Sequence, residues 1–162
     1  MSKTRSNLSV AADRSSLRSP RRLNRALYAQ GDVALSCPFC EPQVSGQVLV
    51  EKDEHCMFID FKHEILAGSG IIVPRVHRET PFELTESEVA STFRLLREVK
   101  VRLDSSLAPD GYNVGWNCGS CAGQEVSHAH LHVIPRFRDE PLAGKGIRYW
   151  LKQVANRRPA GV

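Results

Sequence analysis

Three histidines occupy alternate positions of one short run, His128-Ala129-His130-Leu131-His132, and they are half of the six histidines in the chain. Successive side chains of a β-strand point to opposite faces, so an extended backbone would place all three imidazoles on one face. An imidazole titrates near neutral pH and can transfer a proton, bind a metal ion or attack a phosphorus atom. The run therefore predicts a chemical site that performs one of these three tasks.

The cysteines suggest a second site. Their number is odd, and four of the five form two Cys-x-x-Cys pairs: Cys37, Cys40, Cys56, Cys118 and Cys121. The first residues lack the apolar segment of a secretory signal, so we expect a cytoplasmic protein whose cysteines bind metal or remain thiols. The pair at 37 and 40 suits one metal ion, with a redox pair or two buried thiols as alternatives. For the pair at 118 and 121 we favour small residues in a tight loop over a thiol switch.

Length and charge predict one domain with a basic extension. The chain has 162 residues, of which 41% are hydrophobic and 25% charged, which is typical of one globular domain. Residues 1–30 contain seven Lys and Arg against one acid, so the remainder of this +4 chain is mildly acidic. We therefore predict a basic, disordered extension over 1–30, a folded domain over 31–162, and no nucleic-acid surface on that domain. The apolar runs are too short to span a membrane.

The elements that would position the histidines follow from periodicity and turn residues. Strands are expected over 47–51, 55–61, 70–73, 112–117 and 128–135. A short helix is expected over 21–30. A longer one should begin at Thr85, because Thr85 and Glu88 have the capping-box spacing, and continue to about Asp104 with apolar residues on one side. Strands grouped without regular alternation with helices indicate an α+β domain with an antiparallel sheet.

Residues 111–136, GYNVGWNCGSCAGQEVSHAHLHVIPR, resemble the signature of the histidine triad (HIT) family of nucleotide hydrolases and transferases. The resemblance extends to Phe58-Ile59-Asp60-Phe61 and to residues 71–77, and it covers about residues 37–137. It implies about five antiparallel strands, one main helix, a shorter helix and a homodimer. Residues 143–150 are similar to the tail of bacterial members that hydrolyse diadenosine polyphosphates.

The resemblance also assigns roles. It implies that His130 attacks the α-phosphorus of a purine nucleotide or dinucleoside polyphosphate, and that water then hydrolyses the nucleotidyl-histidine. His128 and His132 belong to the same catalytic set. An aromatic base slot, an acid for the ribose hydroxyls and a phosphate-binding loop are implied at Phe39, Phe58, Asp60, Phe61, Asn117, Gly123, Gln124, Glu125 and Val126.

A structural zinc site is implied by one branch of the family. There, zinc joins the Cys-x-x-Cys pair to a histidine after the third strand and to the first triad histidine, which here are Cys37, Cys40, His77 and His128. A metal held by the three triad histidines is the alternative, but it leaves Asn117 and Gln124 without a role.

Two residues depart from the family pattern. Ser69 stands where many relatives have histidine, and Glu125 stands where many have Ser or Thr. A carboxylate at 125 should repel a polyphosphate unless it points away. The predicted activity is nucleotide hydrolysis, with a phosphoramidase, a nucleotidyl transferase or a nucleotide-binding module of low turnover as alternatives.

Overall fold

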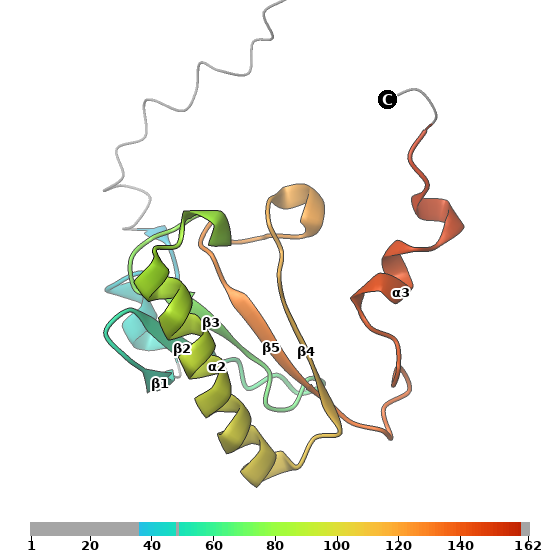
Figure 1. Ribbon diagram of the computed structural model, residues 1–162, viewed down its shortest axis with the longest axis horizontal. Helices are drawn as coiled ribbons and strands as arrows, with labels where there is room; N and C mark the ends of the chain where they lie inside the picture. Colours follow the sequence, from blue (N-terminus) through green and yellow to red (C-terminus); the bar gives the residue numbers. More distant parts are fainter. Residues whose placement is uncertain (1–35, 48, 160–162) are drawn as a thin grey trace, which may run out of the picture.

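Residues 36–47 and 49–159, which the computed structural model describes, form a five-stranded antiparallel sheet with one long helix against it (Figure 1). The sheet has the order β1-β2-β3-β5-β4, with strands β1 (Leu49–Lys52), β2 (Cys56–Asp60), β3 (Gly70–Pro74), β4 (Gly111–Trp116) and β5 (Leu131–Arg136). The α-helices are α2 (Glu86–Leu107) and α3 (Ile147–Leu151), and short 3₁₀ helices are η2 (Gln43–Gly46), η3 (Pro81–Glu83), η4 (Ser120–Ala122) and η5 (Val154–Asn156). The predicted α+β class, antiparallel sheet and pair of unequal helices are confirmed. Residues 1–30, and the helix expected at 21–30, lie outside the described residues.

Helix α2 covers one face of the sheet. It begins with the predicted capping box, in which the Thr85 hydroxyl accepts from the Glu88 N–H and the Glu88 carboxylate accepts from the Thr85 N–H. These two bonds satisfy backbone donors that have no partner within the helix. Its apolar side packs in one core with residues from three strands: Cys56, Phe58, Ile72, Leu95, Val99, Leu103, Leu131 and Val133. The helix is three residues longer than expected and ends where Ala108 adopts a left-handed conformation.

Two separate segments cover the opposite face. Over β2 and β3 the segment that begins at Cys37 forms a second core made of Cys37, Phe39, Cys40, Val44, Met57, Ile59, Ile71 and Val73. Over β4 lies the C-terminal segment, residues 143–159, where Ile147 Cδ1 is 3.5 Å from the position that a Cβ on Gly115 would take. The first residue of α3 therefore lies next to β4 at Gly115. Strand β5 lies between β3 and β4. Its side chains on this face therefore point between the segment that begins at Cys37 and the C-terminal segment.

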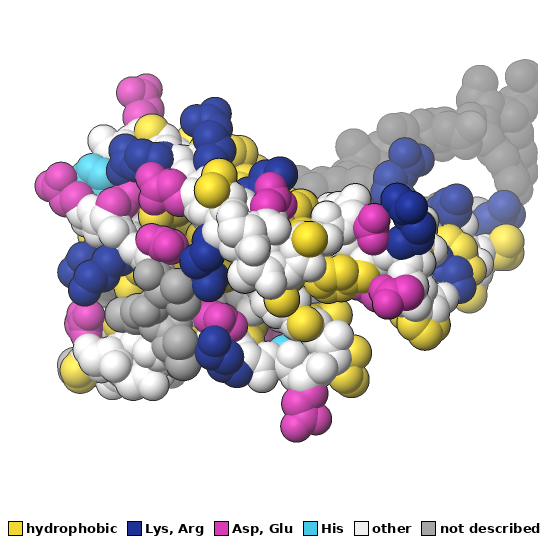
Figure 2. All heavy atoms as spheres, turned by 90° about the horizontal axis from the view of Figure 1, so that it is seen from below, with side chains coloured by type: hydrophobic (Ala, Val, Ile, Leu, Met, Phe, Trp, Pro, Cys, Tyr) yellow, Lys and Arg dark blue, Asp and Glu magenta, His cyan; other side chains and the backbone are white. Residues whose placement is uncertain are grey.

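The C-terminal segment is a separate lobe. Figure 2 shows it at one end of the molecule, where Lys and Arg side chains alternate with hydrophobic ones. Its cations are Lys145, Arg148, Lys152, Arg157 and Arg158. Among the described helices, none has the length and apolar character needed to cross a membrane.

Strand β5 begins later than predicted. The expected strand starts at His128, whereas the sheet ladder starts at Leu131. The preceding backbone bonds elsewhere, because the Ala129 N–H donates to the Arg78 carbonyl and the His128 N–H donates to the Val126 carbonyl. The imidazoles of His130 and His132 nevertheless lie on the same side, with ring centroids 4.9 Å apart. The two imidazoles therefore share a face as expected, although residues 128–130 are not in the ladder.

Asp53, in the turn between β1 and β2, joins this turn to α2. Burial alone would raise the pKa of its carboxyl, but hydrogen bonds from the Cys56 N–H, the Ser91 hydroxyl, Arg94 and the His55 N–H outweigh burial and hold the pKa well below its usual range. A carboxyl whose pKa is lower in the folded than in the unfolded protein stabilises the fold above its unfolded pKa and loses that contribution as pH falls.

We therefore expect Asp53→Asn to lower the free energy of unfolding by about 1–3 kcal/mol at pH 7, with the difference from the wild type shrinking between about pH 5 and pH 2. Urea unfolding at pH 7, 4 and 2.5 measures this difference. Asp110→Asn is the matched control, because Asp110 pairs with the exposed Arg138 at the surface and should change stability by less than about 0.5 kcal/mol. A difference in the free energy of unfolding that stays constant with pH would contradict the stabilising role of the Asp53 charge.

Candidate active site and metal site

Four predicted metal ligands meet beside the second core. The ligand atoms of Cys37, Cys40, His77 and His128 all lie within 4.8 Å of one another. The Nδ1 atom of His128 is 3.4 Å from Cys37 Sγ and 3.5 Å from Cys40 Sγ, and the Nδ1 atom of His77 is 3.4 Å from Cys40 Sγ. Around a tetrahedral zinc ion, bonds of about 2.3 Å to sulfur and 2.0 Å to nitrogen place the two ligand types about 3.5 Å apart. These residues could therefore bind a metal ion.

Burial keeps two of these ligand groups uncharged at neutral pH. Burial, together with a hydrogen bond and the charge of Cys37, raises the pKa of the Cys40 thiol to about 12. Burial is also the main cause that lowers the pKa of His128 to about 4, so this imidazole is neutral at pH 7. Its Nε2 is 2.9 Å from the Pro74 carbonyl oxygen, which only accepts, so Nε2 carries the proton and Nδ1 presents a lone pair to the thiols.

This geometry corrects the role of His128. We predicted it both as a metal ligand and as a catalytic residue, but its side chain is fully buried and both ring nitrogens already have partners. A residue so enclosed cannot touch a substrate. His128 therefore fits the ligand set and acts on the neighbouring histidine only by fixing the backbone between them.

His130 is held in the orientation that a nucleophile needs. Its Nδ1 is 2.7 Å from the His128 carbonyl oxygen, so Nδ1 carries the proton and the neutral ring has its lone pair on Nε2. The ring packs edge-on against Phe39, with centroids 5.6 Å apart, and against His132. A single backbone bond and two ring contacts thus set both the tautomer and the direction of Nε2.

His132 lies at the edge of a groove. Burial lowers the pKa of its imidazole, and the charge of a protonated His130 acts in the same direction. Its Nε2 is buried and has no hydrogen-bond partner in the part of the chain that the structure describes. The groove beside it is also lined by Asn117, whose amide makes only a long 3.5 Å bond to the Gly123 carbonyl. Both side chains retain polar atoms that a phosphate could use.

Gln124 has a different role from the one predicted. Its side-chain oxygen accepts from the Gly119 N–H at 2.7 Å, and its amide nitrogen donates to the carbonyls of Glu79 and Val126. Its backbone N–H is also used, by the Gly119 carbonyl. Gln124, which we expected to donate to phosphate, therefore stabilises the loop through its own hydrogen bonds. Left-handed Gly123 beside it makes the turn possible.

The remaining loop residues are placed as follows. Glu125 is exposed, while Val126 packs against the second core. Because Glu125 is exposed, its carboxylate can point away from a bound phosphate and need not repel it. Ser69, the second departure from the family pattern, is buried, and its hydroxyl has no partner among the described residues.

The predicted aromatic slot is only partly assembled. Phe39 lies against the imidazoles of His128 and His130. Phe58 does not, because it pairs with Ile72 on the face that α2 covers and is fully buried in that core. Residues two apart in a strand share a face, so a slot that contains the neighbouring Ile59 cannot contain Phe58. The structure therefore places Phe58 on the other face of the sheet from Phe39.

Asp60, the acid predicted to bind the ribose hydroxyls, has its partners away from the triad. Asp60 ends β2, and its carboxylate accepts from the backbone N–H and the ammonium group of Lys62, both at 3.0 Å. Burial would raise the pKa of Asp60, but these bonds and the charges of Lys62 and Arg102 lower it. Its described partners are thus Lys62 and helix α2 and not the triad. Phe61 follows it and is 44% exposed.

Three consecutive residues, of which the sequence singled out only His77, hold the site together. His77 reaches Cys40, the Arg78 carbonyl accepts from the Ala129 N–H at 2.6 Å, and the Glu79 carbonyl accepts from Gln124 at 2.7 Å. This segment, residues 77–79, therefore contacts the metal ligands, the backbone between two triad histidines and the phosphate loop. The Arg78 side chain is fixed in turn by Glu88, whose buried carboxylate accepts from Arg78 Nε at 3.1 Å.

Glu88 thus both caps α2 and holds Arg78 in place. We expect Glu88→Ala to lower the free energy of unfolding by about 2–4 kcal/mol and to reduce kcat. The half-buried Arg78 guanidinium would lose its ion-pair partner, the buried Glu88 carboxylate, and the 77–79 segment would lose its anchor. Glu88→Gln should lose less, because its amide oxygen can still accept from Thr85. Urea unfolding and turnover measure both effects. Glu86→Ala, exposed in the same helical turn, is the control, and equal results for the two alanine variants would contradict this assignment.

The HIT domain profile matches residues 41–139, which is more than half of the chain. The chain belongs to the HIT family. An uncharacterised HIT-like protein from Saccharolobus solfataricus is 31% identical over 108 residues, or 65% of this chain and 77% of that protein. The adenosine 5′-monophosphoramidase hnt1 of Schizosaccharomyces pombe is 30% identical over 116 residues, or 69% of this chain and 83% of that protein.

Solved HIT structures share the fold. A zinc-bound histidine triad family protein from Mycobacterium smegmatis superposes with a TM-score of 0.60 at 28% identity, over 68% of this chain and 82% of that one. Its zinc belongs to that protein. For this HIT protein, the four ligand atoms described above are the observation that bears on a metal.

Proposed function

We propose that this HIT protein hydrolyses nucleoside polyphosphates, dinucleoside polyphosphates among them, at the α-phosphorus through a covalent intermediate on His130. The observation that carries the proposal is the hydrogen bond from His130 Nδ1 to the His128 carbonyl. That bond leaves the Nε2 lone pair free for attack, and it also stabilises the positive charge that the ring acquires when Nε2 bonds to phosphorus.

The two steps balance as follows. Nε2 of His130 forms a bond to the α-phosphorus, and the bond from phosphorus to the bridging oxygen breaks, so the remaining phosphates depart with the electron pair. Water then attacks the same phosphorus and the bond to Nε2 breaks, which releases a nucleoside monophosphate and one proton. The Asn117 amide and His132, which line the groove, would bind the phosphoryl oxygens.

A chemical trap tests the intermediate. The protein is mixed with diadenosine tetraphosphate that carries the label in its adenosine, and the reaction is quenched in base, because phosphorus bonds to histidine are labile in acid. We expect label on the wild-type protein and none on His130→Ala. Turnover by the wild type without any trapped label, or label that persists in His130→Ala, would reject the covalent route through this residue.

Phosphoramidate hydrolysis is the second candidate, because a relative that is 30% identical is named an adenosine 5′-monophosphoramidase. A further relative, from Arabidopsis thaliana, is named an adenylylsulfatase. Both substrates that these names imply carry an adenylate group, and the same attack by His130 would apply. The trap run with adenosine 5′-phosphoramidate measures this activity separately. Binding of nucleotide without product release would favour a module of low turnover.

We also propose that the metal is a structural zinc ion held by Cys37, Cys40, His77 and His128. A ligand set of two thiolates and two imidazoles is typical of closed zinc sites, which keep no position open for a substrate. The ion would join the segment at Cys37 to the segment at His77 and to the residue two before the nucleophile. It would therefore position His130 without taking part in the reaction.

A further inference from the structure

Two buried polar atoms beside the triad have no hydrogen-bond partner among the residues that the structure describes: the Ser69 hydroxyl and Nε2 of His132. The other such atoms belong to His77, one of the four predicted metal ligands, and to Arg102 of α2, whose guanidinium lies 5.4 Å from the ring centroid of Phe58. Buried polar groups of folded proteins bond to another protein group or to ordered water. The question is therefore what satisfies the serine and the histidine.

The backbone turns both side chains toward the same face of the sheet. Gly70 begins β3, and a Cβ at this position would lie 2.5 Å from the ring of Phe58, so it would face α2. Successive residues of an extended chain point to opposite faces, so Ser69 and Ile71 face away from α2. His132 is paired directly with Ile71 across β3 and β5, and it shares that face. Ser69 thus lies diagonally across from His132.

The geometry of a diagonal pair leaves room for one water molecule. Such neighbours have Cβ atoms about 7 Å apart, a distance that an imidazole bridges in large part and a serine hydroxyl does not complete. Ser69 is 4% exposed, and its backbone is held by the Leu66 carbonyl, which accepts from its N–H, and by the Phe61 N–H, which donates to its carbonyl. The hydroxyl therefore has a fixed position, and a water molecule between it and Nε2 could bond to both.

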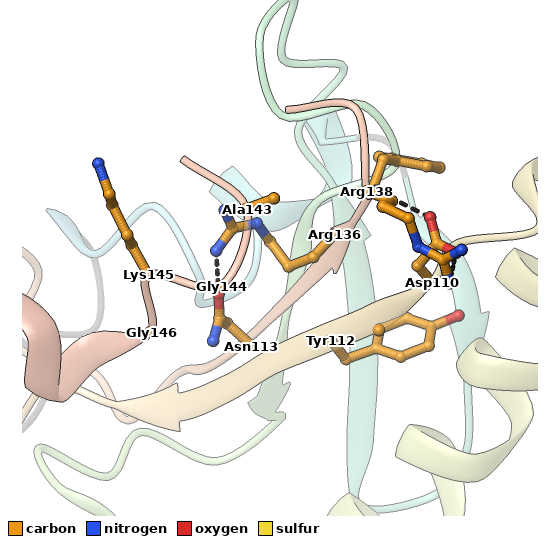
Figure 3. Close-up of a pocket in the computed structure, with 11 residues that line it drawn as sticks. Asp110, Tyr112, Asn113, Arg136, Arg138, Ala143, Gly144, Lys145 and Gly146 are labelled. Atoms are coloured by element: carbon orange, nitrogen blue, oxygen red, sulfur yellow. Dashed lines mark hydrogen bonds and ion pairs between the residues drawn. The ribbon is translucent and has the colours of Figure 1, made fainter. Parts of the chain in front are cut away.

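The other neighbours of His132 on this face do not compete for Nε2. Its direct partners across the two strands, Ile71 and Gly115, have no polar side chain. Arg136 lies farther along the same side of β5, and Figure 3 shows its guanidinium bonded to Asn113. Among these described neighbours, the serine hydroxyl is the group that still has hydrogen-bonding capacity to offer.

The proposed role of His132 requires a donor at its Nε2. Burial lowers the pKa of this imidazole from its ordinary value of about 6.5, so the ring is neutral at pH 7 and has one N–H and one lone pair. Because Nε2 is buried, Nδ1 is the nitrogen left to donate to a phosphoryl oxygen in the groove. Nδ1 can donate only while it carries the proton, which requires that Nε2 accept.

We infer that Ser69 is a positioning residue for the reaction: one buried water molecule, bonded to its hydroxyl, donates to Nε2 of His132 and keeps the ring proton on Nδ1, where it can meet a phosphoryl oxygen. The inference rests on the proposed function for the role of His132. Because the His132 ring also contacts the His130 ring edge-on, the same bond restrains the neighbour of the nucleophile. The serine that departs from the family pattern thereby acts in the reaction without touching the substrate.

A double-mutant cycle with diadenosine tetraphosphate tests whether Ser69 acts through His132. Ser69→Ala removes only the hydroxyl and should lower kcat by about tenfold, the effect of one lost hydrogen bond. In the His132→Ala background the same change should alter kcat by less than about twofold, because the group that Ser69 positions is gone. Ser105→Ala is the control, since its exposed hydroxyl donates to the Val101 carbonyl within α2. It should keep kcat within about twofold of the wild type.

Nitrogen NMR tests the inference without any reaction. In protein that carries isotope-labelled histidine, Ser69→Ala should move the Nδ1 signal of His132 toward the value of an unprotonated nitrogen and leave the signals of the exposed His63 unchanged. Unchanged His132 signals, or an equal loss of kcat on Ser69→Ala in the wild-type and His132→Ala backgrounds, would overturn the inference. Absence of turnover in the wild type would reject the proposed function alone, since the NMR comparison needs no substrate.

Discussion

Substitution of His130 by alanine should lower kcat by at least about a thousandfold, because the proposed reaction has no second group to form the bond to phosphorus. The fold should tolerate this change better than the reaction does. The imidazole makes one hydrogen bond, to the His128 carbonyl, and edge contacts with Phe39 and His132. Steady-state kinetics with diadenosine tetraphosphate, together with a thermal unfolding curve, measure the two effects separately.

His63→Ala is the matched control for this prediction. His63 is exposed, and its Nδ1 accepts backbone hydrogen bonds from Ile65 and Leu66 outside the site. Removing it deletes an imidazole but no group near the triad, so kcat should stay within about twofold of the wild type. Retention of wild-type kcat by His130→Ala would mean that another group attacks phosphorus.

Loss of the metal should have the largest effect on stability. We expect Cys40→Ser to reduce bound metal from about one ion per chain to less than about 0.1, and to lower the thermal midpoint by at least about 10 °C. The reason is that the four ligands come from three segments, beginning at Cys37, His77 and His128, and the ion would cross-link them. Elemental analysis and thermal unfolding measure the two quantities, and a strong chelator should bring the wild type down to the midpoint of the variant.

The control for the metal prediction is Cys121→Ser. Cys121 is exposed in η4 and belongs to the other Cys-x-x-Cys pair, so this variant also loses one thiol but keeps all four ligands. It should retain both the metal and the wild-type midpoint. Equal metal content in Cys40→Ser and Cys121→Ser would reject the metal site.

Local sequence patterns predicted the elements well, because a helix or strand depends on residues close together in the chain. The Thr85 capping box and the apolar spacing behind it located α2, and turn residues located the strands. The strand expected from His128 was wrong in its first three residues, since the Arg78 carbonyl accepts from the Ala129 N–H that a ladder would have used. That partner lies 51 positions away, and no local pattern indicates it.

The sequence alone determined the types of chemistry available: the three imidazoles, the thiol pair and the family to which they belong. Only the tertiary structure decided which side chains share a face of the sheet. Because β5 inserts between β3 and β4, it brings His132 beside the C-terminal groove, while strand alternation turns Phe58 toward α2. The internal bonds of Gln124 and the anchoring of Arg78 by Glu88 were decided in the same way, since they join segments that meet only after the sheet has formed.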